Sequence, residues 1–137
     1  MPHNLMLSLE KSRVRSVHFE LKGDVAGPQI SVPIQISYRY DYKPRQKKIV
    51  SLLIVDISGE KVPFQMRVEF EGIFALNKSA SRKRVETLAN INCPAILFPF
   101  LRECIADITR RADMNSLLLP AVNFVELAKQ PDTPKEA

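Results

Sequence analysis

The sequence contains no tryptophan and only two cysteines, Cys93 and Cys104, among its 137 residues. Two cysteines without a CxxC pair provide neither a disulfide framework nor a zinc site. Histidine is equally scarce, with only His3 and His18. The glycine-rich phosphate-binding motifs and the HExxH and GxSxG motifs are all missing. We therefore predict no catalytic residue, no metal site and no cofactor, which excludes most classes of enzyme.

Long hydrophobic runs are also missing, since none approaches the ~18–20 residues that span a bilayer. The first residues, Met1–Asn4, lack the basic region and apolar core of a signal peptide. A content of 45% hydrophobic and 26% charged residues is ordinary for a globular protein and argues against a largely disordered chain. We predict one domain over residues 1–129 and a polar tail over 130–137, in a reducing compartment and without membrane insertion.

The positive charge is modest, at +5, and is concentrated in short runs. Basic residues cluster at Lys43–Lys48, at Arg82–Arg84 and at Arg110–Arg111. Such clusters can contact phosphates or acidic proteins, but short basic runs in turns are more often simply solvated. Composition therefore leaves the partner open.

Tyrosines near the first basic run allow a nucleic-acid alternative, because aromatic rings on a sheet can stack on bases. Tyr38, Tyr40 and Tyr42 nevertheless share the apolar register of Ile34 and Ile36. We therefore interpret them as core or groove lining and keep nucleic-acid binding as a remote alternative.

Apolar and polar residues alternate along four segments of the first half of the chain. The alternation is complete over 30–43 and recurs over 62–71, which predicts strands with one buried and one wet face. Residues 48–57 are apolar on both faces and are the expected central strand. A weaker strand is expected over 14–21, and Pro33 indicates an edge or a bulge.

After Gly72 the apolar period becomes helical. A short helical turn is expected over 84–90, a long helix over 95–111 with Asn92 as its cap, and a short helix over 122–129. Residues 95–101 are apolar all round, so we expect a second subunit to cover the side that one small sheet cannot bury. The predicted fold is α+β: four antiparallel strands followed by helices on one side.

A surplus of apolar residues flanks the predicted junction between sheet and helix. Ile73–Phe74, Leu117–Leu119 and Phe124 could line a groove for an extended apolar polypeptide. The alternative is that they belong to the ordinary core.

Three motifs stand out in this region: NCPAILFPFLRE at Asn92–Glu103, LLLPAVNF at Leu117–Phe124 and EGIF at Glu71–Phe74. Together they resemble the motifs of the SecB family of bacterial protein-export chaperones. The resemblance implies a cytoplasmic, ATP-independent holdase that keeps client polypeptides unfolded in long apolar grooves. It also implies four strands and two helices assembled as a homotetramer, a dimer of dimers.

The resemblance assigns roles by motif position. Client contact falls to Ile34, Ile36, Ile73, Phe74, Leu117, Leu119 and Phe124. The interface between dimers falls to the helix stripe Leu97, Leu101, Cys104, Ile105 and Ile108.

The sequence departs from the family where an acidic sheet face docks the translocation ATPase SecA. The corresponding positions here are Ser16, Glu20, Gln65 and Arg67, so only one of the four is acidic. Like charges opposed across an interface are costly, and a face that reverses a charge is not expected to keep the same partner. We therefore predict a specialised chaperone that protects a dedicated client, such as the antitoxin of a toxin–antitoxin–chaperone system. The alternative is a general export chaperone that delivers preproteins to SecA.

Overall fold

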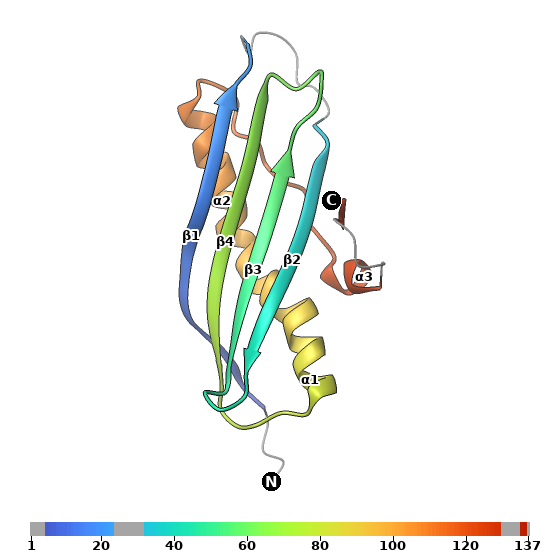
Figure 1. Cartoon of the computed structure of the whole chain (residues 1–137). Coiled ribbons are helices and arrows are strands. Elements are labelled where there is room, and N and C mark those ends of the chain that lie inside the picture. The colour runs from blue at the N-terminus through green and yellow to red at the C-terminus, as the bar shows by residue number, and fades with distance from the viewer. Residues whose placement is uncertain (1–4, 24–31, 130–134, 137) are drawn as a thin grey trace.

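The computed structural model describes residues 5–23, 32–129 and 135–136. It confirms the predicted α+β fold with its four long antiparallel strands, to which a two-residue strand is added in the sheet order β1-β4-β3-β2-β5 (Figure 1). The strands are β1 (Leu7–Leu21), β2 (Ile34–Lys43), β3 (Lys48–Ile57) and β4 (Phe64–Leu76). The predicted tail falls outside the described residues except for β5 (Lys135–Glu136), which pairs with β2. Pro33 comes directly before β2, in keeping with its predicted place beside an edge strand.

Strand β3 is central because both of its faces are apolar. Leu53 and Val55 face the helices, while Leu52 and Ile54 are buried on the opposite face of the sheet. The turn from β2 to β3 closes through a hydrogen bond from the Lys47 backbone N–H to the Pro44 carbonyl, 3.2 Å long. Lys47 adopts a left-handed conformation there, with φ of 54°.

Strands β1 and β4 are both longer than the alternation predicts. Strand β1 begins at Leu7 instead of residue 14, and its register shifts twice, between Leu9 and Lys11 and between Val14 and Ser16. Each bulge inserts one residue and moves the following side chains to the opposite face. The alternation of apolar and polar residues is therefore interrupted twice, and the first half of the strand cannot be recognised from it. Strand β4 continues past Gly72 to Leu76.

The helices are α1 (Arg82–Thr87), α2 (Cys93–Arg111) and α3 (Phe124–Ala128), with a five-residue π-helix, η1 (Leu88–Asn92), between the first two. Ser81 caps α1 by accepting a hydrogen bond from the Arg84 backbone N–H, 3.2 Å long. The predicted cap of α2 is wrong. Asn92 is itself helical and makes no capping bond, because η1 runs directly into α2.

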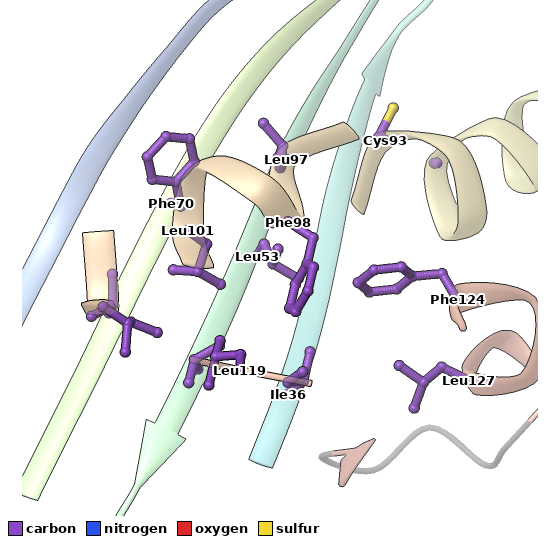
Figure 2. Close-up of a cluster of buried hydrophobic side chains, with 14 of the residues drawn as sticks. Ile36, Leu53, Phe70, Cys93, Leu97, Phe98, Leu101, Leu119, Phe124 and Leu127 are labelled. Carbon is purple, nitrogen blue, oxygen red and sulfur yellow. The ribbon is translucent and has the colours of Figure 1, made fainter. Parts of the chain in front are cut away.

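Helix α2 packs behind the sheet, and its buried side faces β3 and β4 (Figures 1 and 2). Leu97, Leu101 and Ile105 are completely buried in this layer. Gly72 of β4 allows the close approach, because a Cβ atom at this position would lie 2.6 Å from Leu97 Cδ2. The core therefore lies between one sheet and one long helix.

After α2 the chain turns back across the same face of the sheet. Asp113 is left-handed, with φ of 61°, and the buried Thr109 hydroxyl accepts a 2.9 Å hydrogen bond from the Leu117 backbone N–H. Leu119 then enters the core, and Asn123 caps α3 through its side-chain oxygen. This return segment, residues 113–123, places the second SecB-like motif over β2 and β3 (Figure 2).

Candidate functional site

The return segment and α3 leave large apolar side chains on the surface. Leu118 is 64% exposed and Val125 is 46% exposed. Leu117 on the same segment and Ile34 and Tyr38 on β2 are half-buried and pack against the same core, and the Tyr38 ring contacts Phe124, the chain neighbour of Val125. We define the β2–α3 surface as Ile34, Tyr38, Leu117, Leu118 and Val125. Large apolar side chains that are exposed to water often mark an interaction site, because a partner that covers them gains the free energy of their burial.

The β2–α3 surface rests on an aromatic cluster that joins its two sides. The Phe124 ring contacts Tyr38 edge-on, with ring centroids 6.4 Å apart, and contacts Phe98 of α2 in the same way at 5.8 Å. Figure 2 shows Phe124 and Leu127 pointing from α3 toward the cluster around Ile36. The cluster holds α3 beside β2 without using its exposed residues.

The seven residues predicted to contact a client do not form one surface. Ile36, Phe74, Leu119 and Phe124 are buried in the core of the single chain. Ile73 is half-buried and lies opposite Val50 on the far face of the sheet, away from the helices. Only Ile34 and Leu117 belong to the β2–α3 surface.

Sequence reasoning included Leu118 in the groove-lining run Leu117–Leu119 but gave it no client contact, and it missed Val125 altogether. Both stand directly beside motif residues that are buried, Leu119 and Phe124. The run of three leucines was a usable signal, because neighbouring residues of an extended segment point to opposite sides.

The predicted oligomer stripe of α2 is divided by the structure. Leu97, Leu101 and Ile105 pack against the chain's own sheet, while Cys104 and Ile108 are half-buried. A helical stripe of period 3.6 identifies a buried face but not whether the covering sheet belongs to the same chain.

A different apolar area of the helical layer is exposed. Ile96 and Phe100 project from the other side of α2, and the Phe100 ring stacks on Phe70 of β4 with centroids 6.1 Å apart. Val14 is paired with Phe70 in the sheet and is exposed, as are Val17 and Leu21 further along β1. We call these five exposed residues the α2–β1 surface.

The four positions of the predicted docking face do lie together on the outer face of the sheet. Ser16 is paired with Glu69, and Glu20 with Gln65, on the adjacent strands β1 and β4. Arg67 lies between them and is paired with His18. Directly paired residues of antiparallel strands point to the same side.

Charge on this outer face is mixed rather than acidic. Arg67 donates hydrogen bonds to Asp56 at 2.7 Å and to Glu69 at 3.3 Å. The hydrogen bond to Asp56 is the main reason that the pKa of Arg67 is raised. The guanidinium therefore neutralises two carboxylates that would otherwise make this area acidic.

Neither cysteine has the environment of a nucleophile. Burial raises the pKa of Cys93 to about 12, and burial also raises the pKa of Cys104. A thiol that stays protonated is a poor nucleophile and a poor metal ligand. Among the described residues, no group of three His, Cys, Asp or Glu side chains could hold a metal ion, and no helix could cross a membrane.

Residues 6–133 of the sequence match the family described as "Preprotein translocase subunit SecB". The chain belongs to the SecB family. The protein-export protein SecB of Azotobacter vinelandii is 30% identical, with 93% of this chain and 82% of that protein aligned. SecB of Paramagnetospirillum magneticum is 26% identical, covering 88% of this chain and 82% of that protein. Membership of this family confirms the prediction of a chaperone rather than an enzyme.

A solved structure of similar fold is the SecB-like chaperone Rv1957 of Mycobacterium tuberculosis, in complex with a ChAD peptide from the Rv1956 HigA1 antitoxin. It superimposes with a TM-score of 0.69 at 15% identity, covering 85% of this chain and 90% of that chain. At this identity the likeness establishes the shared fold.

Proposed function

We propose that this SecB-family protein is an ATP-independent holdase of the bacterial cytoplasm that protects a dedicated client, such as the antitoxin of a toxin–antitoxin–chaperone system. The observation that carries the proposal is the exposure of Leu118 and Val125 beside a rigid aromatic cluster. Covering apolar area contributes roughly 25 cal/mol per Å² whatever the client's sequence. Such a surface favours unfolded chains over folded ones, because only unfolded chains present contiguous apolar side chains.

The outer face of the sheet supports a dedicated role over export. SecA docking in this family was expected to need an acidic face, and Arg67 instead neutralises Asp56 and Glu69 there. The peptide complex of the M. tuberculosis neighbour, whose peptide comes from an antitoxin, supports the same class of client.

General export is the second candidate function, because the curated relatives are named protein-export proteins. Glu20 is the one acidic residue kept at the four docking positions. Titration of purified SecA into the protein separates the two candidates. We expect no measurable heat of binding at micromolar concentrations, and saturable binding would favour export.

The client surface is tested by a double variant and a control outside both apolar surfaces. Leu118→Ser with Val125→Ser removes one exposed leucine and one exposed valine from the β2–α3 surface. The control, Met6→Ser, removes an apolar side chain that is as exposed as Leu118, at 64%, and belongs to neither the β2–α3 surface nor the α2–β1 surface. Each lost apolar contact should weaken client binding by about 1–2 kcal/mol, or roughly tenfold.

The readout is suppression of aggregation of chemically denatured luciferase, measured by light scattering. The first variant should need at least tenfold more protein for half-maximal suppression, while the control should match the parent at equal concentration of assembled protein. Equal loss in both variants would refute the assignment of the client site to the β2–α3 surface.

We also propose assembly as a dimer of dimers in which the α2–β1 surface forms one of the two kinds of interface. Ile96, Phe100 and Val17 are exposed and apolar. They are therefore available to contact a second subunit, whereas the stripe of α2 is mostly buried in its own chain. A second copy would cover the side of residues 95–101 that the sheet leaves open.

A further inference from the structure

Two basic runs that are far apart in sequence meet at one end of the sheet. The turn from β2 to β3 carries the first run, and α1 begins with the second (Figure 1). The Leu76 backbone N–H, at the end of β4, donates a 2.8 Å hydrogen bond to the Lys47 carbonyl of the turn. Only five residues then separate Leu76 from Arg82, so α1 starts within ~20 Å of the turn.

This end of the molecule carries the positive net charge of the chain. It contains nine of the twenty basic residues, namely Lys11, Lys43, Arg45, Lys47, Lys48, Lys78, Arg82, Lys83 and Arg84. Three of the fifteen acidic residues are nearby, namely Glu10, Asp41 and Glu86. The rest of the sequence holds eleven basic and twelve acidic residues, which nearly balance. We call this region the basic end.

The three acidic residues of the basic end are already engaged. Asp41 pairs with Lys43 at 3.1 Å, and Glu10 pairs with Lys48 at 3.0 Å. Glu86 pairs with Arg82 at 3.3 Å. Within the described part of the chain, five exposed cations of the basic end have no ion pair: Lys11, Arg45, Lys47, Lys83 and Arg84.

The opposite end of the sheet shows that this imbalance is local. Lys22 and Lys61 lie there, where the Lys22 backbone N–H donates to the Pro63 carbonyl. Glu20 and Glu60 lie in the same stretches of chain and match them in number. The two ends of one sheet therefore differ strongly in charge.

The basic end is continuous with the β2–α3 surface along β2. Tyr38, Tyr40 and Tyr42 are half-buried on the helix side of this edge strand, which ends at Lys43. An extended chain advances ~3.3 Å per residue, so about 17 Å, or five residues, separate Tyr38 from Lys43. One extended polypeptide can therefore contact both areas.

We propose that the basic end binds an acidic segment of the client, about five residues from the client's apolar segment. The inference rests on the proposed function and adds the charge of the preferred client. An acidic polypeptide fits better than a nucleic acid, because Tyr40 and Tyr42 are partly buried against the core, whereas base stacking needs a freely exposed ring face. Positively charged clients would be repelled by the same unpaired cations.

The test uses two labelled synthetic peptides in a fluorescence-anisotropy titration. Both carry the same apolar segment, Leu-Phe-Val-Leu-Phe, and a five-residue Gly-Ser spacer, and one ends in four glutamates while the other ends in four glutamines. An exposed ion pair strengthens binding by about 1.4- to 5-fold. We expect the glutamate peptide to bind about tenfold tighter at about 50 mM NaCl, with the preference shrinking at about 500 mM.

Two variants locate the effect. Arg45→Gln with Lys83→Gln removes one unpaired cation from each basic run, and should reduce the tenfold preference to about threefold or less. Lys22→Gln with Lys61→Gln lowers the net charge equally at the opposite end, and should leave the preference unchanged.

Each other outcome overturns a defined statement. Equal affinity for the two peptides refutes the acidic-client inference but leaves polypeptide binding intact. An equal loss in both variants shows an effect of net charge and refutes the site. Failure of both peptides to bind refutes the proposed function itself. A single-stranded oligonucleotide that displaces the glutamate peptide would make the basic end a nucleic-acid site and overturn the proposal.

Discussion

Replacement of Gly72 by alanine tests the packing between sheet and helix on which the whole fold depends. The added Cβ would lie 2.6 Å from Leu97 Cδ2, 3.2 Å from Leu97 Cδ1 and 3.0 Å from Phe74 Cε1. Leu97 and Phe74 are completely buried, so neither side chain can swing into solvent. Helix α2 or the centre of β4 must shift instead.

The expected cost follows from two opposing effects. Overpacking in a filled core destabilises by about 1–3 kcal/mol. Alanine also lowers the conformational entropy of the unfolded chain, which raises the free energy of unfolding by about 0.4–1 kcal/mol. We therefore expect Gly72→Ala to lower the free energy of unfolding by about 1–2 kcal/mol.

Urea unfolding followed by circular dichroism measures this change, and Gly23→Ala is the matched control. A Cβ atom at Gly23 meets nothing within 4 Å, so that variant should be neutral or slightly more stable. Leu97→Val removes both contacting methyl positions, and its cost should be smaller in the Gly72→Ala background than alone. A Gly72→Ala protein as stable as the parent would refute the close-packed contact.

Three further predictions concern the return segment, assembly and pH. Thr109→Val leaves the Leu117 N–H without its acceptor and should lower the free energy of unfolding, measured by urea unfolding, by about 1–3 kcal/mol. Thr109→Ser keeps the hydroxyl and should retain most of the parent's stability. Phe100→Asp should convert tetramers to smaller species in light scattering coupled to gel filtration; an unchanged mass would exclude α2 from the interface. The raised pKa of Cys93, about 12, means that the unfolded chain loses this proton first as the pH rises above about 9. Stability should fall there by up to about 1.4 kcal/mol per pH unit more in the parent than in Cys93→Ala, and parallel pH profiles would contradict this.

The central strands and the long helix could be predicted because burial dictates their residue patterns. Strand β3 is apolar on both faces, and β2 alternates without interruption, so each has a single reading. Strand β1 could not be delimited, since its two bulges reverse the alternation near Glu10 and Arg15. The alternation predicts a strand end at residue 71 because the apolar period changes after Gly72, but β4 continues to Leu76 and the small residue allows the approach of Leu97.

The candidate site was less accessible to sequence reasoning. A motif identifies which residues a family shares, but shared apolar residues such as Leu119 and Phe124 can be core as well as contact. The distinction depends on which side of an extended segment faces the sheet, and that is set by the turn at Asp113 and the bond at Thr109. The placement of Gln65 and Arg67 on one face was predictable, because residues two apart on one strand point to the same side of the sheet.

Native mass spectrometry of the protein purified gently from its own host tests the central claim most directly. It weighs the intact assembly and identifies the polypeptide bound to it. A tetramer that carries one dominant small and acidic partner is the predicted result. A tetramer that carries assorted secretory precursors or SecA would contradict the account and show that export survives despite Arg67.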